Sequence, residues 1–174
     1  GAQKNKLPVE QMLAMMKQNA AALTGWQVIH QTGKSDTEEL RAAYAAAGVP
    51  SLVEPFFRTM GMLWGAADCA VSRCGAGSVA EAWANKVPAI FLPYPYHKDE
   101  HQRRNAEPLE RAGGCEIVTD LIAPEANLPE AGARTLALMA DAGRREAMRA
   151  GLTRLGPADG AARVARAIVS REAH

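Results

Sequence analysis

The segment with the clearest chemical meaning is glycine-rich and leads from a predicted strand into a predicted helix, Ser72-Arg73-Cys74-Gly75-Ala76-Gly77-Ser78-Val79-Ala80-Glu81. Free N–H groups in the first turn of a helix, together with the helix dipole, favour a bound phosphate or diphosphate. Gly75 and Gly77 carry no side chain that would hold a phosphate away from the backbone. The G-x-G-x-x-G dinucleotide fingerprint fails at Ala80. The segment therefore predicts an anion-binding loop of another kind.

Ser78 and Glu81 in this segment allow two interpretations. Their spacing fits a capping box, in which both side chains bond to backbone N–H groups at a helix start. Alternatively, the Glu81 carboxylate turns towards a ligand and accepts hydrogen bonds from ribose hydroxyls. The spacing alone favours neither interpretation.

A second polar segment begins the helix after the next strand, with the sequence His101-Gln102-Arg103-Arg104-Asn105. Parallel topology places this helix start near the glycine-rich loop. Gln102 and Asn105 share one helix face, so we expect them to face that loop. Arg103 and Arg104 are interpreted as a solvated helix start.

Two familiar motifs are incomplete. Gly33-Lys34-Ser35 resembles the end of a P-loop, but Val28 stands where the first glycine should be, so we interpret a strand-to-helix turn. His97-Lys98-Asp99-Glu100-His101 matches the H-x-x-E-H motif of zinc peptidases. Because His97 follows a Pro-Tyr-Pro-Tyr loop, we expect it to precede the helix, which removes the i,i+4 geometry that two zinc ligands need. The prediction is that the chain has no metal site.

A cysteine, a histidine and two phenylalanines could each either take part in chemistry or binding or serve the fold alone. Nothing in the sequence activates Cys74 as a nucleophile, so we interpret it as a small buried residue. His30, at a strand end, is interpreted as a hydrogen-bonded residue that shapes the following loop. Phe56 and Phe57, after Pro55, either form an apolar slot for a planar base or pack in the core.

Alternating short strands and helices must position these residues. Predicted strands cover 26–30, 51–53, 68–72, 89–92 and 115–118, and predicted helices cover 7–24, 35–47, 58–67, 78–86, 101–112, 129–140, 143–155 and 159–171. This alternation predicts an α/β fold, a parallel sheet with helices on both faces. Ligands of such sheets bind beyond the carboxyl ends of the strands, in the loops at 31–36, 54–58, 72–78 and 93–101.

Composition limits the classes of function. A length of 174 residues fits one domain with a full core, and a net charge of +1 with 5 % aromatic residues argues against nucleic acid as the principal partner. No apolar run approaches the roughly 20 residues that span a bilayer, and the N-terminal residues do not read as a signal peptide. The odd number of three cysteines predicts no disulfide framework and favours an intracellular domain.

Four segments, in this order, resemble the MurG family, the glycosyltransferases that complete lipid II in bacterial cell-wall synthesis. They are Ile29-His30-Gln31-Thr32-Gly33-Lys34, Glu54-Pro55-Phe56-Phe57, the segment from Ser72 to Glu81, and Pro93-Tyr94-Pro95 with His97-Lys98-Asp99-Glu100-His101-Gln102 leading to Asn105-Ala106. Pro108-Leu109-Glu110-Arg111-Ala112-Gly113 is similar to the family's continuation. The resemblance covers nearly the whole chain.

The resemblance implies a fold and an activity. MurG proteins have two Rossmann-like lobes in the GT-B arrangement, and residues 1–174 resemble the C-terminal, donor-binding lobe alone. The implied donor is UDP-GlcNAc, and the implied reaction is an inverting transfer to lipid I that gives lipid II. No cofactor is implied. The catalytic base, the lipid I site and peripheral attachment to the cytoplasmic face of the bacterial membrane would belong to an N-terminal lobe that is absent from these residues.

The resemblance also implies roles for particular residues. Phe57 would lie at the uracil. Ala76, Gly77 and Ser78, flanked by Gly75 and Val79, would contact the diphosphate. Glu81 would hold the ribose hydroxyls, and His101 and Gln102 would face the GlcNAc hydroxyls. At Gly77 the family commonly has a bulkier residue, and Pro55 before Phe56 is unusual for it.

Two other functions stay open beside this one. The chain would also suit a non-catalytic UDP-sugar-binding subunit of a two-component glycosyltransferase, or a related glycolipid synthase, since such proteins share the G-A-G-S…E pattern. The His-Gln-Thr-Gly segment and the H-x-D-x-H-Q…N-A segment favour the MurG family.

Overall fold

The fold is known from a computed structural model that describes residues 20–33, 37–96 and 101–172. Most of the predicted helix over 7–24, the predicted cap at Ser35 and the first residues of the H-x-x-E-H match lie outside the described residues. At the end of that predicted helix, the described residues Ala20–Leu23 form a 3-10 helix, η1.

The described strands are all parallel and form two hydrogen-bonded sheets. In the first sheet β1 (Val28–Gln31) pairs with β2 (Ser51–Glu54). In the second, β4 (Ala89–Phe91) lies between β3 (Ala70–Ser72) and β5 (Cys115–Ile117). The predicted α/β class is confirmed, whereas the expectation of one continuous sheet is corrected to two.

Helices alternate with the strands as predicted. They are α2 (Thr37–Ala46), α3 (Met60–Ala66), α4 (Ala76–Asn85), α5 (His101–Arg111), α6 (Pro124–Asn127), the π-helix η2 (Leu128–Gly132), α7 (Ala133–Ala140), α8 (Ala142–Arg154) and α9 (Gly160–Glu172). The helix predicted over 78–86 begins two residues earlier, and the helix predicted over 129–140 is divided between η2 and α7. Helix α5 continues through Pro108.

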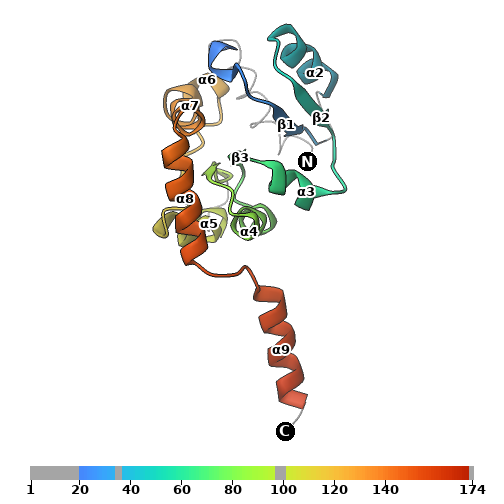
Figure 1. Ribbon diagram of the computed structural model, residues 1–174, viewed down its shortest axis with the longest axis vertical. Helices are drawn as coiled ribbons and strands as arrows, with labels where there is room; N and C mark the ends of the chain where they lie inside the picture. Colours follow the sequence, from blue (N-terminus) through green and yellow to red (C-terminus); the bar gives the residue numbers. More distant parts are fainter. Residues whose placement is uncertain (1–19, 34–36, 97–100, 173–174) are drawn as a thin grey trace.

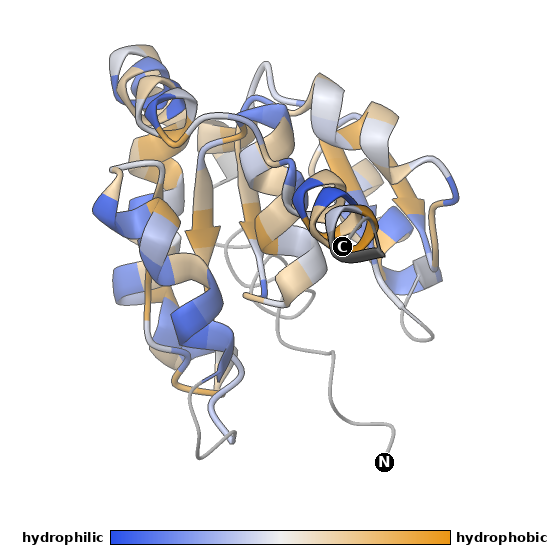
Figure 2. Ribbon diagram, turned by 90° about the horizontal axis from the view of Figure 1, so that it is seen from below, coloured by the Kyte–Doolittle hydropathy of each residue, from blue (hydrophilic) through white to orange (hydrophobic). Residues whose placement is uncertain are grey.

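Strand β4 forms the centre of the core because both of its faces are covered. Ala89 and Phe91 pack in one cluster with residues of α4 and α5, including Ala82 and Ala106. Ile90 packs on the other face, in a cluster to which α7 and α8 contribute Leu138 and Met148. Every residue of the strand is buried, which confirms the prediction from its fully apolar sequence. Figure 2 shows hydrophobic strands flanked by helices of mixed polarity.

A separate cluster packs the first sheet. It contains Leu40 and Tyr44 of α2 with Val53 of β2, and Met139 of α7 joins it. The two sheets are therefore linked by shared helix packing as well as by the chain. In Figure 1, β1, β2 and α2 lie to one side of the β3–β5 sheet and its helices.

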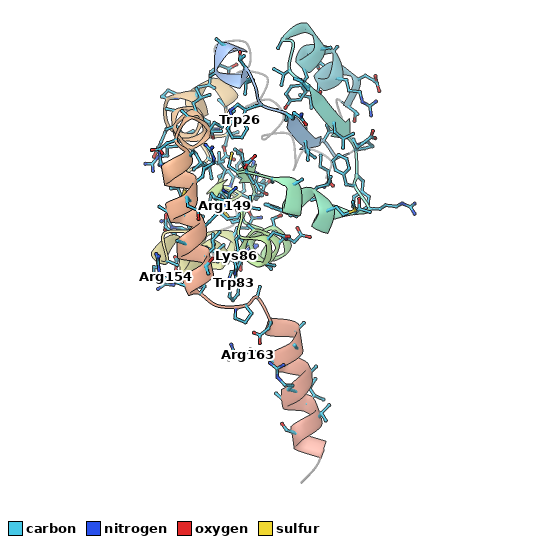
Figure 3. The ribbon with its side chains drawn as sticks, in the orientation of Figure 1. Trp26, Trp83, Lys86, Arg149, Arg154 and Arg163 are labelled. Atoms are coloured by element: carbon cyan, nitrogen blue, oxygen red, sulfur yellow. The ribbon has the colours of Figure 1, made fainter. Side chains whose placement is uncertain are left out.

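Helix α9 extends away from the other elements (Figure 1). Val164, Ile168 and Val169 on it are exposed. The loop before it is held by α4, because Trp83 Nε1 donates to Gly156 O at 3.0 Å and Lys86 Nζ donates to the same oxygen at 3.1 Å. Figure 3 shows both side chains at the end of α8 where the chain turns towards α9. Within the described ranges, no helix has both the length and the apolar character needed to cross a membrane.

Candidate functional site

Helix α4 begins directly beyond the carboxyl end of β3, as the glycine-rich segment predicted. Gly75 is the N-cap, with φ −61° and ψ 145°, and the N–H of Val79 makes a helical bond to Gly75 O at 3.0 Å. The N–H groups of Ala76, Gly77 and Ser78 precede that bond, so none has a carbonyl partner one turn back in the helix. Ala76 and Gly77 are exposed. This helix start offers an anion three backbone donors and the positive end of the helix dipole.

The capping-box interpretation of Ser78 and Glu81 is wrong. Since the helix begins at Ala76, Ser78 is its third residue and Glu81 its sixth, and the N-cap Gly75 has no side chain to donate or accept. A capping box needs these residue types at the N-cap and at the third helical position. The Glu81 carboxylate instead accepts a hydrogen bond from Trp64 Nε1 at 2.9 Å.

Neither packing nor backbone conformation in the described structure requires glycine at 75 or 77. A Cβ built at either position would meet no heavy atom within 4 Å, and neither residue has a positive φ. Open space over the helix start leaves room for a ligand that contacts the backbone directly.

Arg73, just before the loop, ties the ends of three strands together. Its Nη1 donates to Leu92 O at 3.1 Å and to Pro93 O at 3.4 Å, both beyond β4, and it pairs with Asp120 beyond β5. The Asp120 side chain is fully buried and the Arg73 side chain is 15 % exposed. Within the described ranges, Nε and Nη2 of Arg73 are the buried side-chain atoms without a hydrogen-bond partner.

Asp120 is itself held on its other oxygen. Oδ1 accepts from Ile122 N at 2.8 Å and from Asn127 Nδ2 at 2.9 Å, while Asn127 Oδ1 accepts from Leu121 N at 2.8 Å. A buried carboxylate with this many donors is a fixed anchor. The anchor orients Arg73, and through it the residues that lead into the glycine-rich loop.

Helix α5 contacts the same region through Asn105, one of the two residues that were predicted to face the glycine-rich loop. Asn105 Nδ2 donates to Cys74 O at 3.0 Å, which brings its side chain to the glycine-rich loop. Gln102 Oε1 accepts from Tyr94 N at 2.9 Å, so its side chain lies at the loop after β4. His101 is the first residue of α5 and is exposed.

Phe56 and Phe57 have different environments at the carboxyl end of β2. Phe57 is 9 % exposed and Phe56 is 68 % exposed, so the two rings do not form one slot. Phe57 N donates to Gln31 Oε1 at 3.1 Å. Gln31 ends β1, and its side-chain carbonyl thus bridges the ends of the two strands of the first sheet.

Cys74 is a small buried residue, as interpreted from the sequence, and His30 is hydrogen-bonded as interpreted, but to α2 rather than to the loop that follows it. His30 Nδ1 lies 3.0 Å from Tyr44 Oη, and burial lowers the pKa of His30 to about 4, so the imidazole is neutral at pH 7. Cys74 is fully buried, and burial raises the pKa of its thiol to about 12. It therefore stays protonated and is a poor nucleophile. Among the described residues, no group of three or more His, Cys, Asp or Glu side chains is arranged to hold a metal ion.

Sequence reasoning missed Trp64, Arg73, Asp120 and Gln31. Arg73 and Asp120 each follow a strand closely, and polar residues just beyond parallel strands are a signal that could have found them. No local spacing links Trp64 to Glu81, which are 17 residues apart.

The fold and the glycine-rich loop define a Rossmann-like α/β domain. After its third strand, a helix N-terminus is suited to bind an anion. The chain belongs to the family described as the glycosyltransferase family 28 C-terminal domain, whose model matches residues 1–162. The predicted relationship to the glycosyltransferases is thereby confirmed.

Named relatives point the same way. The chain is 33 % identical over 171 residues to a UDP-N-acetylglucosamine–N-acetylmuramyl-(pentapeptide) pyrophosphoryl-undecaprenol N-acetylglucosamine transferase of Desulfotalea psychrophila, an alignment that covers 97 % of the chain and 45 % of that protein. A protein of the same name from Pelobacter propionicus is 47 % identical over 88 residues, 51 % of the chain and 23 % of the relative. The crystal structure of Acinetobacter baumannii MurG has the same fold, with a TM-score of 0.70 at 24 % identity over 92 % of this chain and 49 % of that chain. The chain thus spans about half the length of the Desulfotalea psychrophila and Acinetobacter baumannii proteins.

Proposed function

We propose that these residues form the donor-binding half of a MurG-type glycosyltransferase, and that the donor is UDP-GlcNAc. The names of the relatives support this donor. The single observation that carries the proposal is the start of α4, where three backbone N–H groups without helical partners precede the Glu81 carboxylate on one helix. The N–H groups of Ala76, Gly77 and Ser78, with Gly75 and Val79 beside them, bind the diphosphate. Glu81 accepts hydrogen bonds from the ribose hydroxyls.

The two ends of the donor extend from this helix start to other loops. Phe57 lies at the uracil, and its backbone N–H, which now donates to Gln31 Oε1, donates to a carbonyl of the base instead. His101 and Gln102, at the start of α5, face the GlcNAc hydroxyls. Gln102 keeps its amide NH₂ for the sugar while its oxygen accepts from Tyr94 N.

The reaction that this half supports is an inverting transfer of GlcNAc to the muramyl sugar of lipid I, which gives lipid II. UDP leaves with developing negative charge, and a helix start stabilises that charge without reorganisation of side chains. A general base must deprotonate the acceptor hydroxyl. We place that base, the lipid I site and the attachment to the cytoplasmic face of the membrane in an N-terminal lobe outside these residues. The isolated chain is then expected to bind donor without transferring it.

The test is titration of the Glu81→Gln variant with UDP in a calorimeter. Glutamine preserves the size and the helix but offers one acceptor oxygen without charge, and charge-assisted hydrogen bonds are roughly twice as strong as neutral ones. UDP binding should weaken by about 1–3 kcal/mol, roughly 5- to 150-fold in Kd, with the melting temperature nearly unchanged.

The matched control is Glu146→Gln on α8, where the glutamate side chain is 76 % exposed. It should bind UDP like the parent chain. If Glu81→Gln also binds UDP like the parent chain, the assignment of Glu81 to the ribose is wrong.

A further inference from the structure

Trp64 makes an unusual contact for a core residue. Its side chain packs in the main cluster and is 7 % exposed, yet its indole Nε1–H points out of that cluster to Glu81 Oε2, 2.9 Å away. A buried indole N–H needs an acceptor, and here the acceptor is an ionisable side chain rather than a backbone carbonyl.

This contact leaves half of the carboxylate available. A carboxylate has two oxygens that accept hydrogen bonds, and the bond to Trp64 engages Oε2. Glu81 as a whole is only partly buried, and within the part of the chain that the structure describes its other oxygen, Oε1, has no hydrogen-bond partner. The bond fixes the rotamer of a side chain that would otherwise sample many conformations.

The contact also joins two parts of the candidate site. Trp64 lies on α3, the helix that follows Phe57, whereas Glu81 lies on α4, which begins at the glycine-rich loop. The indole ring of Trp64, anchored in the core, thus sets the position of Glu81 relative to Phe57, the residue proposed to lie at the uracil.

We infer that Trp64 is a positioning residue, whose indole N–H holds Glu81 ready to accept the ribose hydroxyls of the donor. The inference rests on the proposed function of Glu81. Ordering the carboxylate before the ligand arrives removes part of the entropy cost of binding.

The test compares Trp64→Phe with the parent chain by calorimetric titration with UDP and with 2′,3′-dideoxy-UDP, which lacks both ribose hydroxyls. Phenylalanine keeps an aromatic ring in the core but has no N–H. UDP should bind about 3- to 10-fold more weakly, the effect expected when one side chain must be ordered on binding. The dideoxy compound should bind both proteins equally. In a Glu81→Gln background, Trp64→Phe should add less than about 2-fold, because coupled residues are not additive.

The matched control is Trp83→Phe. Trp83 also donates an indole hydrogen bond, at 3.0 Å, but to Gly156 O beyond α8. Figure 3 places it at the far end of α4, beside the turn into α9. Its loss should lower stability and leave UDP binding within about 2-fold of the parent chain, as for a distant independent site.

A second measurement uses the unmodified chain, which has three tryptophans. Their indole N–H groups give separate NMR signals, assigned from the Trp26→Phe and Trp83→Phe variants. Saturating UDP should shift the Trp64 signal most. If UDP binds but Trp64→Phe lowers its affinity no more than Trp83→Phe does, or the Trp64 signal does not move, the positioning role is wrong. If the parent chain binds no UDP, the proposed function itself fails.

Discussion

His30 is a single residue whose burial makes the stability of the first sheet depend on pH. It lies on β1, is 8 % exposed, and bonds through Nδ1 to Tyr44 Oη of α2 at 3.0 Å. Burial lowers its pKa from 6.5 to about 4, so the unfolded chain binds a proton in a range where the folded chain does not. The stability gained by keeping His30 neutral is complete above pH 6.5 and is lost as the pH falls towards 4.

We expect this loss to reach about 3 kcal/mol, at about 1.4 kcal/mol per pKa unit. Urea unfolding at steps between pH 7 and pH 4 measures it. Titration of acidic residues also changes the stability over this pH range, and the His30→Gln variant keeps that contribution while removing the imidazole. Between pH 7 and pH 4 its free energy of unfolding should therefore fall less than that of the parent chain. Equal losses in the two proteins would show that His30 does not carry the pH dependence.

Single residues also show where sequence reasoning succeeded and failed. The interpretation of Cys74 as a small buried residue is confirmed. His30 is hydrogen-bonded as interpreted, but its partner Tyr44 lies on α2, not in the loop that His30 was expected to shape. The spacing of Ser78 and Glu81 matches a capping box, but the helix begins at Ala76. That start depends on the path of the chain between β3 and α4, which the spacing does not encode. The bond from Trp64 to Glu81 requires that α3 and α4 lie side by side, which no local spacing encodes.

At the scale of elements, Arg73 and Asp120 hold together the carboxyl ends of β3, β4 and β5. The two residues are 47 positions apart and both are largely or fully buried. Removing one partner of a buried ion pair leaves an uncompensated buried charge. This lowers the stability of the fold much more than replacing the whole pair by apolar residues of similar volume does.

The Asp120→Asn variant tests this anchor. It keeps the shape and one carbonyl oxygen but leaves the Arg73 cation without its counter-charge, so we expect a loss of about 3–5 kcal/mol in the free energy of unfolding. Asp68→Asn is the control. Asp68 pairs with Arg149 at 3.3 Å with its side chain 64 % exposed, and exposed pairs contribute less than about 1 kcal/mol. Equal effects of the two variants in urea unfolding would contradict the anchor.

The order and type of these elements could largely be predicted, because short apolar runs and amphipathic periods are local. Strand β4 was predicted to within one residue, since Ala89, Ile90 and Phe91 are all apolar. The division into two sheets could not be predicted, because it depends on how the strands pair in space. The π-helix over Leu128–Gly132 has no local signature that separates it from the α-helices on either side.

At the scale of the whole molecule, the two sheets are held by different hydrophobic clusters and meet through α7, which contributes Met139 to one cluster and Leu138 to another. The loop after β2 and the first turns of α4 and α5 carry the residues proposed for the uracil, the diphosphate and the sugar. The chain corresponds to about half of its MurG-type relatives. Under the proposed function the chain contacts the donor from one side only, so we expect weaker donor binding than in a complete two-lobed transferase.

Backbone amide NMR can show whether the start of α4 binds the diphosphate of UDP-GlcNAc, as proposed. The isotope-labelled chain is titrated with UDP-GlcNAc while the N–H signal of each residue is followed. The signals of Ala76, Gly77 and Ser78 should be among those that shift most, because their N–H groups gain an anionic acceptor. Saturating ligand that leaves these three signals in place, while others move or none do, would contradict this assignment.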